Sequence, residues 1–145
     1  MLEKIDSILF PTDGSEAAKK ASESCFNFVK NVDAELHVIY VIEGLYPSKI
    51  GESTGRKLKK IHKEEGQKEI NELKEKAKER DIKCESAILE GIPDIQITNY
   101  AQEKDVDLIL MSTHGRGGAK RLLLGSVTEK VVRTSDKPVL TIRPS

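Results

Sequence analysis

Cysteine and tryptophan are scarce in this sequence, which has two Cys and no Trp among its 145 residues. Cys25 and Cys84 stand far apart, without a Cys-x-x-Cys spacing or a neighbouring group of histidines. The zinc sites and thioredoxin-type redox chemistry that cysteines support therefore lack their ligands. We expect two reduced thiols with structural roles.

An excess of charge of either sign is also missing, because 24 Lys and Arg residues balance 24 Asp and Glu residues. Such a chain has no global electrostatic field with which to hold a nucleic acid or an anionic membrane surface. We therefore expect neither nucleic acid nor membrane among its partners.

Long hydrophobic runs are absent as well. No segment approaches the roughly 18 apolar residues of a membrane span, and the apolar run after Lys4 is too short for a secretion signal. These absences predict a cytoplasmic location. A chain of this length fits a single domain, residues 1–145, which can bury about two-thirds of its unfolded surface without a disulfide or a metal.

Short apolar runs alternate along the chain with longer patterns of helical periodicity. Runs rich in apolar and β-branched residues predict strands at 5–10, 36–42, 82–89, 106–111 and 138–143. Apolar residues spaced three and four apart, with the usual start signals, predict helices at 15–30, 56–80, 93–103 and 127–134. Glycine, proline and serine in segment 43–55 predict a long exposed loop. With right-handed crossovers, this alternation predicts one doubly wound α/β domain, a parallel sheet with helices on both faces.

Two segments that follow predicted strands carry polar residues and glycines. Segment 11–16 reads Pro-Thr-Asp-Gly-Ser-Glu, and segment 112–126 begins Ser-Thr-His-Gly and ends Gly-Ser. In open parallel sheets, ligands bind beyond the carboxyl ends of the strands. Gly115 and Gly125 allow close approach of the backbone, and a helix that follows presents about half a positive charge at its start. The pattern therefore predicts a phosphate-binding site.

Helix capping is the alternative explanation for two of these residues. Asp13 is a strong N-cap type and is followed three residues later by Glu16. Ser126 with Glu129 fits a capping box at the start of the last helix. Both readings stay open at the level of the sequence.

The chain resembles the universal stress proteins over its whole length. The resemblance is carried by Pro-Thr-Asp-Gly-Ser at 11–15, Glu-Gly-Ile-Pro at 90–93 and Pro-Val-Leu-Thr-Ile at 138–142. The ATP-binding branch of that family has a Gly-x-x-Gly motif, nine further residues, and then Gly-Ser or Gly-Thr. This chain matches at Gly115, Gly125 and Ser126, and has Ser112 where the first glycine is expected. The serine adds a side chain to the motif, and its hydroxyl can donate a hydrogen bond.

The resemblance implies a Rossmann-like fold of the adenine nucleotide alpha hydrolase type, with a five-stranded parallel sheet of order 3-2-1-4-5. It implies ATP as ligand, with Mg²⁺ or Mn²⁺, and a homodimer formed through the strand at 138–143, whose edge would otherwise stay open. It also implies a set of nucleotide-binding residues: Pro11, Thr12, Asp13, Val41, Met111, Ser112, His114, Gly115, Gly125, Ser126, Val127 and Thr128.

A catalytic set is not evident in the sequence. Lys120 is followed by Arg121 and not by Ser or Thr, so the glycine-rich segment is not a P-loop. Hydrolysis of ATP needs a positioned water, a base and usually Mg²⁺, and Asp13 and His114 are the available candidates. His37 and His62 are expected to be structural or surface residues. We therefore expect an ATP-binding regulatory or stress-response protein without efficient catalysis; a slow ATPase or phosphotransferase, and a nucleotide-free dimeric interaction module, are the alternatives.

Overall fold

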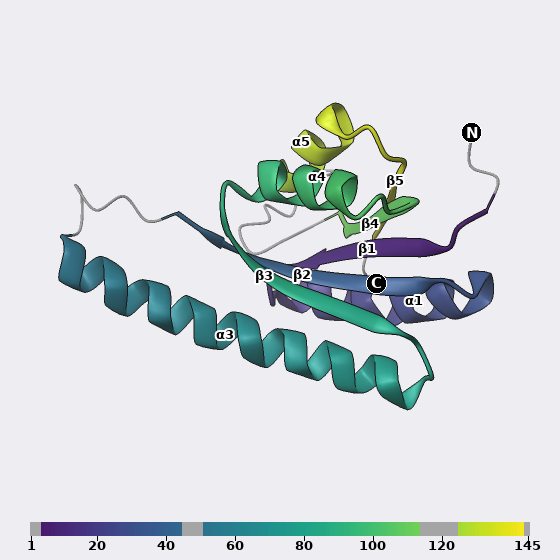
Figure 1. The fold of residues 1–145 in the computed structure, drawn as a ribbon, viewed down its shortest axis with the longest axis horizontal. Helices are drawn as coiled ribbons and strands as arrows, with labels where there is room; N and C mark the ends of the chain where they lie inside the picture. Colours follow the sequence, from purple (N-terminus) through teal and green to yellow (C-terminus); the bar gives the residue numbers. More distant parts are fainter. Residues whose placement is uncertain (1–3, 45–50, 114–124, 144–145) are drawn as a thin grey trace.

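Helices and strands alternate along the described part of the chain. The computed structural model describes residues 4–44, 51–113 and 125–143. Its elements are β1 (Ser7–Thr12), α1 (Glu16–Val32), β2 (Glu35–Glu43), α3 (Glu52–Glu79), β3 (Cys84–Gly91), α4 (Pro93–Glu103), β4 (Leu108–Ser112), α5 (Ser126–Thr134) and β5 (Val139–Ile142). The strands form one five-stranded sheet of order β3-β2-β1-β4-β5, and all four pairings are parallel (Figure 1). The predicted fold class and strand order are confirmed.

Strand β1 lies later in the chain than the prediction of 5–10. It continues through Pro11 and Thr12, although proline normally interrupts a central strand because it lacks an N–H group. Pairing with β2 extends to Thr12, whereas pairing with β4 is found only as far as Leu9. At Pro11, β1 is therefore paired with β2 but no longer with β4. This resembles the edge of a sheet, where proline is tolerated.

The prediction of a long loop at 43–55 is wrong at both ends. Glu43 belongs to β2, and α3 begins at Glu52 after Gly51, which has a φ of 75°. The N–H of Gly55 donates to the carbonyl of Gly51 at 3.0 Å, within the first turn of the helix. The last residues of the predicted loop therefore form the first turn of α3. Small residues destabilise a helix little at this position, because the first backbone N–H groups have no partner within the helix.

The other boundaries differ from the predictions by a few residues at most. Gly91, expected to end the third strand, is its last residue and has a φ of 144°. The prediction of 82–89 corresponds to β3 at 84–91, 106–111 to β4 at 108–112, 138–143 to β5 at 139–142, 15–30 to α1 at 16–32, and 127–134 to α5 at 126–134.

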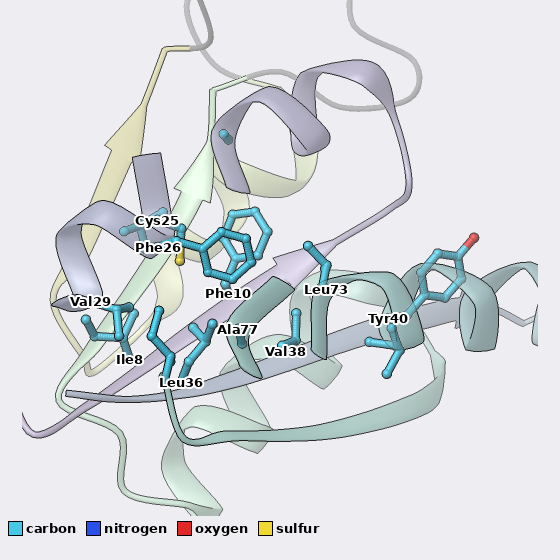
Figure 2. Packing of buried hydrophobic residues seen from close by; sticks show 14 of the residues in the cluster. Ile8, Phe10, Cys25, Phe26, Val29, Leu36, Val38, Tyr40, Leu73 and Ala77 are labelled. Atoms are coloured by element: carbon cyan, nitrogen blue, oxygen red, sulfur yellow. The ribbon is translucent and has the colours of Figure 1, made fainter. Parts of the chain in front are cut away.

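Helices α1 and α3 cover one face of the sheet, and α4 and α5 cover the other (Figure 1). Because both faces are covered, successive residues of the central strands are buried, as is usual in parallel sheets. The core under α1 and α3, part of which Figure 2 shows, comprises Ile8, Phe10, Ala21, Cys25, Phe26, Val29, Leu36, Val38, Tyr40, Ile42, Ile70, Leu73, Ala77, Ile82, Leu108 and Leu110. The core under α4 and α5 comprises Leu9, Ile39, Ile97, Tyr100, Ala101, Val106, Ile109, Met111 and Val131.

The long helix α3 is buried only along its second half, beginning at Gly66. Gly66 lies directly against the ring of Tyr40 on β2. A Cβ atom added at Gly66 would lie 2.7 Å from Cδ1 of Tyr40, closer than real Cβ contacts. The glycine therefore lets α3 approach the sheet at a point where another residue would have to push the two elements apart.

Both cysteines are free thiols, as predicted. Burial raises the pKa of Cys84 to about 11 and raises the pKa of Cys25 further still. Both thiols are therefore protonated and unreactive at neutral pH, which agrees with structural roles. Among the described residues, no helix combines the length and the apolar character needed to cross a membrane.

Candidate functional site

The carboxyl ends of β1 and β4 lie side by side at the same end of the sheet. Leu9 of β1 pairs with Ile109 of β4 in parallel register. Continuing that register places Thr12, the last residue of β1, level with Ser112, the last residue of β4. On the other side of β1, Thr12 pairs with Tyr40 of β2. The sheet thus places segment 11–16 next to the beginning of segment 112–126.

The turn after β1 is fixed by its own polar side chains. The N–H of Gly14 donates to Oγ1 of Thr12 at 3.2 Å, and the N–H of Ser15 donates to Oδ1 of Asp13 at 2.9 Å. Gly14 has a φ of 76°, which a residue with a side chain rarely adopts. Ser15 is the N-cap of α1, and its hydroxyl accepts from the N–H of Ala18 at 3.1 Å. The alternative of Asp13 as N-cap is therefore wrong: the carboxylate shapes the turn that precedes the cap.

Glu69 of α3 contacts this turn, and it was not among the predicted site residues. The hydroxyl of Thr12 donates to Oε1 of Glu69 at 3.4 Å, while the same hydroxyl oxygen accepts from Gly14. Glu69 is 7% exposed, and burial raises the pKa of its carboxyl group, with the charge of Lys19 opposing that shift. A buried carboxylate thus contacts the turn that carries Asp13. The available signal was its position beside Ile70 on the apolar stripe of α3.

We expect Glu69→Gln to flatten the pH dependence of stability. The native pKa of Glu69 lies above its unfolded value of about 4.3, so the native state holds the proton more tightly. The stability that this group contributes is full below pH 4.3 and is lost as the pH rises through the raised native pKa. Urea unfolding at about pH 4 and at pH 7 should show the variant gaining stability, relative to wild type, at the higher pH.

Glu75→Gln is the matched control for this measurement, because Glu75 lies on the exposed face of the same helix and is not among the groups that shift the pKa of Glu69. It should leave the pH profile unchanged. Equal losses of stability at both pH values in Glu69→Gln would show instead that the carboxylate acts only through its hydrogen bond with Thr12.

Helix α5 is joined to the end of β4 by hydrogen bonds between buried groups. Oγ1 of Thr128 donates to the carbonyl of Ser112 at 2.8 Å, and the N–H of Gly125 donates to the carbonyl of Thr113 at 2.5 Å. Thr113 in turn donates its N–H to the carbonyl of Ile142 on β5 at 2.9 Å. The start of α5 is therefore held at the carboxyl end of β4.

The N-cap of α5 is Gly125, and no side chain caps the helix there. Ser126 is already the first residue of the helix and is exposed. The capping-box alternative for Ser126 and Glu129 is therefore wrong. Among the residues that the structure describes, no side chain caps the amide groups in the first turn of α5, so the positive end of the helix can attract an anion.

The remaining predicted site residues lie at the same end of the sheet, with different exposures. Pro11, Val41 and Val127 are half-buried, whereas the side chain of Met111 is buried under α4 and α5. Met111 can therefore contact a ligand through its backbone, while its side chain packs in the core. His114 and Gly115 lie outside the described residues.

Comparison with known proteins identifies the family of this chain. The family model described as the Universal stress protein family matches residues 4–143. The universal stress protein MJ0531 of Methanocaldococcus jannaschii is 36% identical over 137 residues, which cover 94% of this chain and 81% of that protein.

Solved structures share the fold. The structure of protein MJ0577, from the same organism, matches with a TM-score of 0.86 at 33% identity and covers 97% of each chain. A universal stress protein family protein of Arabidopsis thaliana, solved with AMP bound, matches with a TM-score of 0.73 at 18% identity, over 97% of this chain and 92% of that one. At that identity the second likeness concerns the fold alone.

Proposed function

Because the chain belongs to the universal stress protein family, we propose that it binds an adenine nucleotide, ATP, at the carboxyl ends of β1 and β4. AMP is bound in the Arabidopsis protein of the same fold, which supports an adenine nucleotide as the ligand class. Binding would serve a regulatory or stress-response role, without efficient catalysis. A cytoplasmic location stays a prediction.

The start of α5 is the observation that carries the proposal. Its uncapped amides face the same end of the sheet as the turn that Asp13 shapes. Phosphate oxygens would accept hydrogen bonds from the backbone N–H groups of Ser126 and Val127, next to Gly125, where the helix dipole also favours negative charge. A Mg²⁺ or Mn²⁺ ion would be bound mainly by the phosphates, as these ions usually are.

The adenosine would lie on the side of β1. Pro11, Thr12 and the backbone of Val41 would contact the base, and Asp13 would accept hydrogen bonds from the ribose hydroxyls. A carboxylate suits this position because hydrogen bonds to a charged acceptor are stronger than neutral ones. Ser112 and the backbone of Met111 would lie between ribose and phosphates, close to the carbonyl that Thr128 holds.

Isothermal titration with MgATP tests the proposal. Wild-type protein should bind one ATP per chain, and Asp13→Ala should weaken binding by about 10- to 100-fold, because a charged hydrogen-bond acceptor is lost. Asp13→Asn keeps an oxygen for the N–H of Ser15 but removes the charge, and so separates loss of the turn from loss of the ribose contact.

Asp136→Ala is the matched control, because Asp136 is exposed in the segment between α5 and β5, at the opposite end of the strands. It should bind ATP as tightly as wild type. If wild-type protein gives no binding heat at millimolar ATP, the proposal fails and a nucleotide-free interaction module becomes the better description.

A homodimer is the second part of the proposal. β5 pairs with β4 on one side only, and its residues Val139–Ile142 are all half-buried at the edge of the sheet. Pairing with β5 of a second copy would cover this apolar edge and satisfy its backbone groups. Size-exclusion chromatography with light scattering should give twice the chain mass of 16.1 kDa; the mass of a single chain would contradict the dimer.

A further inference from the structure

A second group of ligand-type side chains lies at the other end of the sheet. His37 of β2 is 3% exposed and points to the face that α4 covers, where its ring meets that of Tyr100 edge-on at 5.8 Å. Glu85 of β3 is paired with His37 across the strands, and Glu35 lies two residues before it on the same strand face. Two carboxylates therefore flank one buried imidazole.

Both ring nitrogens of His37 have close polar neighbours. Nδ1 lies 2.9 Å from the hydroxyl of Tyr100 and 3.4 Å from Oε2 of Glu85. Nε2 lies 3.2 Å from Oε1 of Glu35. One ligand atom from each of Glu35, His37 and Glu85 can be chosen so that all of them lie within 4.8 Å of one another.

A neutral imidazole cannot form favourable contacts with all of these neighbours at once. A neutral ring has one N–H donor and one acceptor nitrogen. If Nε2–H donates to Glu35 and Nδ1 accepts from Tyr100, then Nδ1 faces Glu85 with one acceptor against another. The two carboxylates also repel each other at this separation. A cation between the three groups would remove both conflicts.

We propose that Glu35, His37 and Glu85 bind a divalent transition-metal ion of the zinc type. Imidazole nitrogen and carboxylate oxygen are ordinary zinc ligands, at about 2.0–2.2 Å. Two such ligands on a tetrahedral ion stand about 3.4 Å apart, and Nε2 of His37 is 3.2 Å from Oε1 of Glu35. Glu85, whose side chain is 56% exposed, can close in on the ion, with water as the fourth ligand.

Tyr100 and Lys83 complete the surroundings of this site. The hydroxyl of Tyr100 contacts Nδ1, the ring nitrogen that an ion on Nε2 leaves free, and fixes the orientation of the imidazole as outer partners of metal-binding histidines usually do. Nζ of Lys83 lies 3.5 Å from Oε2 of Glu35 and competes with a metal for that carboxylate. Since Glu35 begins β2, the site is at the amino end of the strand, away from the proposed nucleotide site.

The bound ion would join β2, β3 and α4 at one point. The site was not predicted from the sequence, because Glu85 lies on another strand, far along the chain from Glu35 and His37. Its occupation does not depend on ATP, so it can be tested on nucleotide-free protein, and failure of one proposal leaves the other intact.

Titration of chelator-treated, nucleotide-free chain with Co²⁺, followed by visible absorption, tests the site. One Co²⁺ per chain should give the spectrum of a tetrahedral or five-coordinate ion, and Zn²⁺ should displace it. Zn²⁺ alone should also raise Tm, since an ion that binds only the native state stabilises it. Absence of a Co²⁺ spectrum, or of a Zn²⁺-dependent rise in Tm, overturns the proposal.

Variants assign the ligands. Glu85→Gln and His37→Gln should each weaken Co²⁺ binding by more than about 100-fold, beyond the 10- to 100-fold loss typical of outer partners, which Tyr100→Phe should show. The side chain of Glu85 is 56% exposed, so its variant should fold normally. Lys83→Met should strengthen binding by freeing Glu35.

Two control variants test whether other side chains bind the ion. His62→Gln removes a half-buried histidine on α3 that contacts Glu65 at 3.6 Å, and it should leave Co²⁺ binding unchanged. Cys84→Ser removes the thiol next to Glu85 in sequence and should also leave binding unchanged. Loss of binding in either control, or unchanged binding in Glu85→Gln, contradicts the assignment.

Discussion

Replacing Phe26 with alanine should lower the free energy of unfolding by about 3–5 kcal/mol, the range observed when a buried aromatic ring is deleted. Phe26 lies on α1 and is 1% exposed, packed in the core beside Phe10 (Figure 2). The guanidinium group of Arg80 lies 4.8 Å from the centre of its ring. The variant therefore loses core contacts and a cation–π contact together.

Phe28→Ala is the matched control for Phe26→Ala. Phe28 belongs to the same helix, two residues further on, but is only half-buried at the margin of the core. Its loss should cost clearly less in urea unfolding monitored by circular dichroism. Equal effects of the two substitutions would mean that helix propensity, and not core packing, determines the result.

Gly66→Val should destabilise the protein by about 3 kcal/mol, at the upper end of what overpacking a core costs. Valine brings a Cβ to 2.7 Å from Cδ1 of Tyr40 and adds two methyl groups beyond it. Tyr40 is 3% exposed and has little room to move. The gain in helix propensity over glycine, less than about 1 kcal/mol, is too small to compensate.

A double-mutant cycle with Tyr40→Leu identifies the cause. If the clash with the Tyr40 ring is responsible, Gly66→Val should cost much less in the Tyr40→Leu background, measured by urea unfolding. Additive losses in the two backgrounds would show that Gly66 is needed for a reason other than its contact with Tyr40.

The order of elements was predictable because each carries its own periodicity. Segment 36–42 is nearly continuous in apolar residues, and the structure buries it between two layers of helices as β2. Charged residues with a narrow apolar stripe indicated the long helix α3, although its start at Glu52 was missed among breaker residues. Local composition thus predicts the type of an element better than its ends.

The candidate site was predictable in position and less so in detail. The strand order brings segment 11–16 close to the end of β4 and the start of α5, as expected from parallel winding. The capping alternatives for Asp13 and Ser126 could be decided only from coordinates, because a cap differs from its neighbours in backbone angles and hydrogen bonds.

Contacts between distant elements could not be predicted from the sequence. Glu69 reads as one more charge on a charged helix, yet it meets Thr12 from 57 positions away. Gly66 reads only as a residue that weakens its helix, since the ring of Tyr40 is invisible to local periodicity. Such pairings depend on how helices pack on the sheet, which a single sequence does not specify.

The hydrogen bond from the N–H of Gly125 to the carbonyl of Thr113 joins the start of α5 to the end of β4. A second bond, from Thr128 to the carbonyl of Ser112, holds the same two ends together. Lengthening the peptide that connects them would therefore cost little closure entropy, about 0.6 kcal/mol for a doubling. Relatives could therefore gain or lose residues in this stretch, and change which ligand they accept, while the sheet and both cores keep their packing.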